Sequence, residues 1–211
     1  DNGGIVSAPG PLFAEFEGPK IPGVPTMHRC TFLAITSFLL MSSNVFAAPP
    51  PKAGPAFTLL SPAFDHGNFM DIKYTCEGKD ISPPLKWVHV PKGTKSLVLI
   101  MDDPDAPDPA APEMIWVHWV VYNLPPKSGE LKEGEIKFPK GAVQGLNDFR
   151  NIGYGGPCPP TGIHRYFFRL YALDIKFKKV RSPTRTGLLK DMEGHIIGRA
   201  ITMGSYQKKK R

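Results

Sequence analysis

Short apolar runs separated by turns rich in proline and glycine make up the hydrophobic pattern of most of the chain. Three runs are long and nearly uninterrupted, which is typical of strands buried within a sheet. They cover residues 96–101 (SLVLIM), 115–124 (IWVHWVVYNL) and 166–177 (YFFRLYALDIKF). Shorter runs predict three further strands, and these cover residues 57–60, 71–75 and 85–90.

Helical periodicity is nearly absent, and a single segment carries clear helix signals. Residues 184–192 begin at Thr184, a residue type that caps helix N-termini, and end just before Gly194, which favours a helix end. Many short strands with so little helix predict a mainly β fold, either a sandwich or a barrel. We place one such domain at residues 57–206, followed by a basic tail at 207–211.

The segment that precedes this domain has the pattern of a secretory signal peptide at residues 27–47. Met27 is followed by a basic residue, Arg29, and then by an apolar stretch at 31–41 (TFLAITSFLLM). Small residues follow, and Ala47 occupies the position before the predicted cleavage point. The apolar stretch is too short to span a bilayer comfortably, although a retained N-terminal anchor helix is the alternative interpretation.

Signal removal predicts a periplasmic or secreted protein with no integral membrane span. The remaining N-terminal residues fall into two parts. Residues 1–26 are rich in proline and glycine and are interpreted as a disordered extension or a mis-assigned start, and residues 48–56 as a proline-rich linker.

The chain is basic, with a formal net charge of +7. A basic charge can indicate nucleic acid, an anionic lipid surface or a phosphorylated partner. Here much of the excess lies in the last four residues, Lys208 to Arg211, and no basic stripe alternates with aromatic residues. Nucleic acid is therefore excluded as a predicted partner.

Two cysteines, Cys76 and Cys158, remain in the predicted mature chain. Export would allow them to form a disulfide, but each lies beside a loop rich in proline or glycine and could equally be a free buried thiol. Neither belongs to a Cys-x-x-Cys pair, so a structural zinc site is not predicted.

Polar side chains adjoin the three long apolar runs. Asp102, Asp103 and Asp105 follow the first run, His118 lies within the second, and His164 precedes the third. Clustered carboxylates repel each other unless a cationic or protonated group lies between them, and a histidine among apolar neighbours needs a hydrogen-bond partner. A pocket shared by the three segments would meet both requirements.

These segments resemble the phosphatidylethanolamine-binding protein family, which includes the Raf kinase inhibitor proteins. That family carries a DPDAP segment, a histidine some fifteen residues later and a Gly-x-His-Arg-Tyr segment further on. The chain has DPDAP at 103–107, then His118, then GIHRY at 162–166. Its segments 154–160 (YGGPCPP) and 74–78 (YTCEG) resemble the bacterial, Raf kinase inhibitor-like branch.

The resemblance implies a two-sheet antiparallel β-sandwich with one or two short helices and a pocket for phosphate-type groups at one end. The pocket residues it implies are Asp103, Pro107, His118, His164 and Tyr166, with Trp116 as a wall. Two imidazoles there could donate N–H bonds to phosphate oxygens and would bind more tightly once protonated. Asp103 could fix an imidazole tautomer or accept from an ammonium group.

The predicted function is a non-catalytic binding or regulatory protein for a small anionic or zwitterionic ligand such as phosphate or phosphorylethanolamine. No cofactor and no metal are predicted. An exported protease inhibitor is the alternative, and the family also implies kinase-like partners, which an exported protein would not meet. A hydrolase or a metal site using the Asp/His pocket is less favoured, with Cys158 as the one candidate nucleophile.

Overall fold

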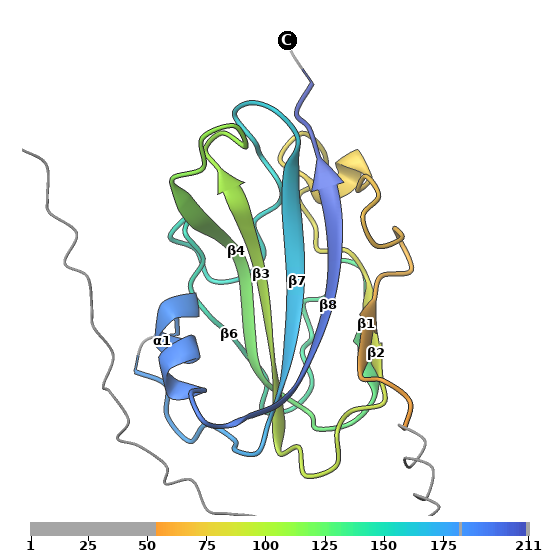
Figure 1. Ribbon diagram of the computed structural model, residues 1–211, viewed down its shortest axis with the longest axis vertical. Coiled ribbons are helices and arrows are strands. Elements are labelled where there is room, and N and C mark those ends of the chain that lie inside the picture. Colours follow the sequence, from red (N-terminus) through yellow and green to blue (C-terminus); the bar gives the residue numbers. More distant parts are fainter. Residues whose placement is uncertain (1–53, 182, 210–211) are drawn as a thin grey trace, which may run out of the picture. The chain divides into compact units, whose positions relative to one another are not determined.

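The computed structural model describes residues 54–181 and 183–209, so the predictions for residues 1–26 and 27–47, and for most of 48–56, lie outside the described part. Within the described residues the fold is mainly β (Figure 1). The strands are β1 (Thr58–Leu60), β2 (Leu85–Val88), β3 (Ser96–Ala106), β4 (Met114–Leu124), β5 (Gly129–Leu131), β6 (Val143–Gln144), β7 (His164–Leu173) and β8 (Ile196–Tyr206). None of the described helices is long and apolar enough to cross a membrane.

Two antiparallel sheets enclose the main core, which confirms the predicted sandwich. The larger sheet has the order β6-β4-β3-β7-β8 and the smaller one the order β1-β2-β5. Side chains from both sheets meet between them, among them Leu85 and Trp87 of β2 and Leu99, Trp119 and Phe168 of the larger sheet. Burial of these large apolar side chains is the main force that holds the two sheets together.

The helix α1 (Arg185–Asp191) covers part of the outer face of the larger sheet (Figure 1). Thr184 caps it as predicted, because its hydroxyl accepts a hydrogen bond from the Gly187 N–H. Leu188 of α1 packs with Val98 and Ile100 of β3 in a second, smaller core. Since Leu97, Leu99 and Met101 face the main core, the first long apolar run is buried on both faces as predicted.

The predicted strand at 71–75 is wrong, because this segment contains a short 3-10 helix, η1 (Ile72–Tyr74). The side chain of Asp71 accepts from the Lys73 N–H at 2.8 Å, and the Thr75 hydroxyl donates to the Ile72 carbonyl at 2.8 Å. These local side-chain bonds replace the ladder bonds that a strand would need. The third long run also ends earlier than predicted, at Leu173.

The strand β8 has no counterpart among the predicted strands, because two glycines interrupt its apolar pattern. Both glycines are required by close packing. A Cβ at Gly198 would lie 2.6 Å from Pro91 Cγ, and one at Gly204 would lie 2.4 Å from Met70 Cγ. The absence of side chains at these two positions lets neighbouring loops pack directly against the strand.

Candidate functional site

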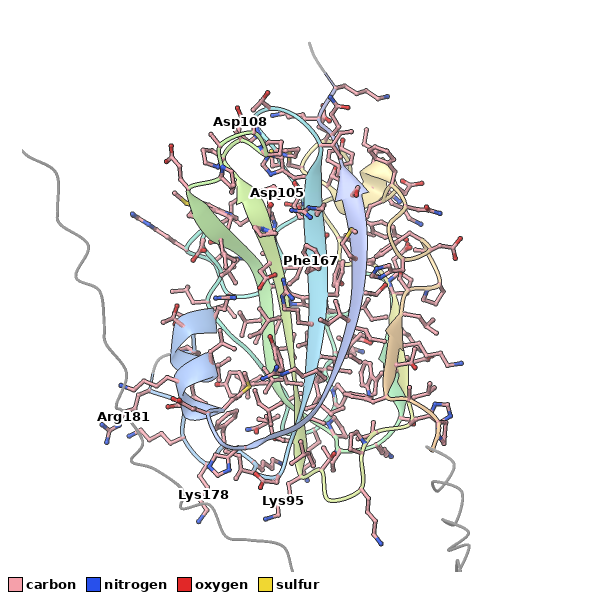
Figure 2. All side chains as sticks on the ribbon, in the orientation of Figure 1. Lys95, Asp105, Asp108, Phe167, Lys178 and Arg181 are labelled. Atoms are coloured by element: carbon pink, nitrogen blue, oxygen red, sulfur yellow. A yellow bond between two sulfur atoms is a disulfide. The ribbon has the colours of Figure 1, made fainter. Side chains whose placement is uncertain are left out.

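The three central strands of the larger sheet bring the predicted polar residues to the same end. Asp102 pairs with Val117 of β4 and with Phe167 of β7, so the residues that follow or precede these positions lie side by side. In Figure 2, Asp105 and Asp108 mark this end of β3, and Lys95 marks the opposite end. The first long run was predicted to cover residues 96–101, but β3 continues to Ala106, with register irregularities between Asp103 and Ala106.

A cavity of about 320 Å³ opens at this end, and all six residues predicted for the pocket line it. Its lining residues are Asp103, Ala106, Pro107, Met114, Trp116, His118, Phe149, Cys158, Pro159, Pro160, His164 and Tyr166. Most of the wall is apolar or aromatic, and the polar groups are few. This composition is typical of a pocket for a small organic ligand that is oriented by a small number of polar contacts.

His164 and Asp103 form a buried pair in this cavity. The Nδ1 atom of His164 lies 2.7 Å from Oδ2 of Asp103, and Oδ1 of Asp103 accepts from the Asp105 N–H at 2.8 Å. Burial raises the pKa of Asp103 above its ordinary value, although the hydrogen bond from His164 opposes this shift. The pair therefore holds a carboxyl group that takes up a proton more readily than an exposed aspartate does.

The two neighbouring carboxylates, Asp102 and Asp105, form ion pairs with arginine rather than with histidine. Asp102 accepts from Nε of Arg169 at 2.9 Å and from Nε of Arg185 at 3.0 Å. Asp105 is bound by Arg165, which lowers the pKa of Asp105. Each of the clustered carboxylates therefore has an arginine or histidine partner, as expected, but Asp102 and Asp105 do not line the cavity.

His118 has a different hydrogen-bond partner from His164. Its Nδ1 lies 2.7 Å from the carbonyl oxygen of Gly155, and because a carbonyl only accepts, Nδ1 carries the proton. Burial lowers the pKa of His118 to about 4, so the ring is neutral near pH 7. Its Nε2 is then an acceptor. The expectation that both imidazoles donate to the ligand is therefore wrong for His118.

Two buried polar atoms beside the cavity have no hydrogen-bond partner. They are Nε2 of His164 and the hydroxyl of Tyr166, and they are the only such buried side-chain atoms found among the described residues. Burial raises the pKa of Tyr166, so its hydroxyl keeps its proton and can donate. Since a buried polar group without a partner costs about 1–3 kcal/mol, the pair of atoms points to a ligand that satisfies both.

A disulfide holds one wall of the cavity. Cys158, a lining residue, is bonded to Cys76, which decides between the two states left open by the sequence. The same loop is also fixed by the Gly156 N–H, which donates to Oδ1 of Asp80 at 2.7 Å. Because its sulfur is in the disulfide, Cys158 is no thiolate nucleophile in this structure.

The profile of the phosphatidylethanolamine-binding protein family matches residues 60–207. The chain belongs to this family. A protein of Methanothermobacter thermautotrophicus described as a UPF0098 protein is 47% identical over 149 residues, which cover 69% of this chain and 95% of the relative. A UPF0098 protein of Chlamydia trachomatis is 48% identical over 150 residues, covering 71% of this chain and 98% of that relative.

Solved structures of the family share the fold. A phosphatidylethanolamine-binding protein homolog from Chlamydia trachomatis has 47% identity and a TM-score of 0.67, covering 73% of this chain and 99% of its own. Escherichia coli YbcL, described as a member of the mammalian PEBP family, has 33% identity and a TM-score of 0.65. That match covers 74% of this chain and 100% of YbcL.

Several lining residues of the cavity were not predicted from the sequence. Phe149 packs edge-on against both Trp116 and His118, with ring centroids 5.4 Å and 5.3 Å apart. Met114, Pro159 and Pro160 complete the wall. Loop residues such as Phe149 carry no periodic signal, because their position depends on bonds to distant segments. The proline-flanked Cys158 was the one local sign that this loop has a fixed shape.

Proposed function

We propose that this protein is a non-catalytic binding protein whose cavity holds a small phosphate-type anion or a phospholipid headgroup. The observation that carries the proposal is the pair of buried polar atoms without partners, Nε2 of His164 and the Tyr166 hydroxyl. A tetrahedral anion offers several oxygen acceptors, so one molecule can accept from both groups. The cavity volume of about 320 Å³ suits a headgroup-sized ligand.

Anion binding at His164 would require one additional proton on the buried pair. With Asp103 ionised, Nδ1 of His164 donates to it, and Nε2 of a neutral ring bears a lone pair that repels an anion. Nε2 carries a hydrogen only if the ring is an imidazolium or if the proton lies on Asp103 and the tautomer is reversed. The raised pKa of Asp103 favours such proton uptake.

The other polar and aromatic groups favour a ligand that also carries a positive charge. Nε2 of neutral His118 can accept a hydrogen bond but cannot donate one. Trp116 and Phe149 present aromatic rings to the same cavity, and aromatic faces attract ammonium groups. A zwitterion such as phosphorylethanolamine would place its phosphate at His164 and Tyr166 and its ammonium group near His118.

We further propose that the protein is located in the periplasm or outside the cell. The disulfide between Cys76 and Cys158 supports it, since such bonds persist in oxidising compartments. The signal-like pattern at residues 27–47 supports it independently.

Calorimetry on the full chain tests the proposal with phosphorylethanolamine and with sulfate, whose own charge does not change between pH 6 and pH 7.5. We expect saturable binding of both, with sulfate affinity about tenfold higher at pH 6 because the protein takes up a proton. Titrations in two buffers of different ionisation enthalpy would count that proton directly.

The matched variants are His164→Gln and His195→Gln, because His195 also binds an aspartate through Nδ1 but lies outside the cavity. Loss of binding in His164→Gln alone would support the cavity site. An absence of binding to the wild type, or equal losses in both variants, would contradict the proposal.

A further inference from the structure

The strand β8 is the edge of the larger sheet, and part of that edge is already covered. Figure 1 shows β8 beside β7 on one side, with β1 of the smaller sheet nearby on the other. The segment 67–70 covers the C-terminal half of this edge. The Gly67 N–H donates to the Met203 carbonyl at 2.8 Å, and the Met70 N–H donates to the Ser205 carbonyl at 2.9 Å.

The other half of the edge is open at Arg199 and Ile201. In an antiparallel strand both backbone groups of one residue point to the same side, and the side alternates from residue to residue. The backbone groups of Met203 and Ser205 point to the edge, and the pairing with β7 runs without a shift from Ser205 to Gly198. Those of Arg199 and Ile201 therefore point to the edge too. No hydrogen bond reaches them from any described residue.

Exposed aliphatic side chains accompany this open edge. Ile197 is 41% exposed and Ile201 is 44% exposed, and both flank Arg199. Edge strands are normally protected by lysine, proline or a covering segment, because an open apolar edge pairs with other chains. Here the segment 67–70 reaches only as far as Met203, so no described backbone segment covers the stretch between the two isoleucines, and Arg199 is the charged residue within it.

A hollow lies directly beside the open edge. Its volume is about 430 Å³, and β1 and the loop after it form the opposite wall. The lining residues are Thr58, Leu59, Leu60, Ser61, Phe64, Asp65, His66, Ile201 and Thr202. A strand added to β8 would send every second side chain into this hollow, where Leu60 and Phe64 favour apolar groups.

The outer face beside the same edge is positively charged. Arg199 and Arg169 line a second hollow next to α1, and Arg169 shares a single carboxylate, Asp102, with Arg185. No ion pair to Arg199 occurs among the described residues. The alternate side chains of an added strand would lie beside these guanidinium groups, where carboxylates are favoured.

We infer that the open edge of β8 at Arg199 and Ile201 binds an extended peptide segment of a partner protein as an additional strand. The partner segment alternates acidic and apolar residues, with the acidic ones beside Arg199 and the apolar ones in the hollow next to β1. Backbone hydrogen bonds supply the affinity, and the two rows of side chains supply the specificity. This surface is separate from the cavity, which shares no lining residue with either hollow.

The test uses the full chain and a fluorescent seven-residue peptide of alternating glutamate and valine, with a lysine–valine peptide as the comparison. We expect saturable anisotropy changes with the glutamate peptide only. In hydrogen exchange followed by NMR, that peptide should slow exchange at the Arg199 and Ile201 amides at least about tenfold.

Two variants and one control make the test specific. Ile201→Pro removes an edge N–H that β7 does not use, and proline is tolerated at such edge positions, so it should abolish binding while the fold is kept. Arg199→Glu should weaken the glutamate peptide at least about tenfold and favour the lysine peptide. Lys178→Glu changes the charge equally at an exposed site that lines neither hollow and should leave binding unchanged (Figure 2).

Several results would overturn the inference. They are absence of peptide binding, protection of amides elsewhere, or equal effects of Arg199→Glu and Lys178→Glu. Protection of the same two amides by rising protein concentration alone would assign the edge to a second copy of this chain and would also overturn it.

Discussion

Two histidine–aspartate pairs lie at opposite ends of the paired strands β7 and β8. In one, Nδ1 of His164 is 2.7 Å from Asp103, and in the other, Nδ1 of His195 is 2.9 Å from Asp174. The first pair is buried, and Nε2 of His164 has no hydrogen-bond partner among the described residues. The second pair is 44% and 46% exposed, so water can satisfy its free atoms.

The comparison shows that the pairing of two residue types does not by itself make a binding site. Both pairs have nearly the same geometry, but only the buried one leaves an unsatisfied polar atom beside a cavity. Water cancels most of the energetic value of the exposed pair, whereas burial makes each missing hydrogen bond costly. The two ends should therefore respond differently to matched substitutions.

The largest expected effect is the loss of stability on removal of the disulfide in the cavity wall. Among the described residues, the His195 end has no such bond. Replacing Cys76 and Cys158 by alanine should lower the free energy of unfolding by about 4 kcal/mol, because the bond closes a loop of 82 residues. Urea denaturation would measure this loss. Binding should also weaken, since Cys158 lines the cavity. An unchanged midpoint would contradict the role given to the bond.

The next effect is a pH dependence of stability caused by His118. Its pKa is about 4 in the fold and near 6.5 in the unfolded chain, so the unfolded chain takes up the proton first as the pH falls. The contribution of this neutral ring to the free energy of unfolding is complete above about pH 6.5. It falls by about 3 kcal/mol in total as the pH is lowered towards about 4. Across this range the wild type should lose about 3 kcal/mol more stability than His118→Asn, and denaturation of both proteins would measure the difference. Parallel curves would refute it.

A smaller effect distinguishes the two aspartates directly. Asp103→Asn replaces the carboxylate with an amide that donates to Nδ1 of His164, as a protonated Asp103 would, so Nε2 carries a hydrogen at every pH. Sulfate should then bind without pH dependence, and at pH 7.5 at least as tightly as it binds the wild type. Asp174→Asn makes the same change in the exposed pair and should leave the affinity within about twofold. Calorimetry with sulfate would measure both. The same pH dependence of sulfate binding in both variants would remove the distinction between the pairs.

The sequence predicted the elements whose pattern is local. The continuous run at 96–101 indicated a buried central strand, and Thr184 indicated the start of α1. β8 was not predicted because Gly198 and Gly204 interrupt its pattern for reasons of long-range packing. The strand prediction for 71–75 failed because the apolar alternation does not reveal the local hydrogen bonds that Asp71 and Thr75 make through their side chains.

For the candidate site, the residue types were predictable, but their protonation was not. His118 and His164 are equivalent in a sequence motif, whereas the structure gives one a carbonyl partner and the other a carboxylate partner. Only the three-dimensional arrangement shows which nitrogen is left without a partner. The arginines that match Asp102 lie 67 and 83 residues away in the sequence, which no local pattern could indicate.

The most direct test of the proposed site compares two tyrosines of the main core. Tyr154 donates its hydroxyl proton to the Tyr74 carbonyl at 2.7 Å, whereas the hydroxyl of Tyr166 has no partner. Tyr154→Phe should lower the free energy of unfolding by about 1 kcal/mol and leave ligand affinity unchanged. Tyr166→Phe should maintain or raise stability and weaken phosphorylethanolamine binding about tenfold. If Tyr166→Phe instead lowered stability and left binding unchanged, the hydroxyl would be a structural group and the proposed ligand site would be wrong.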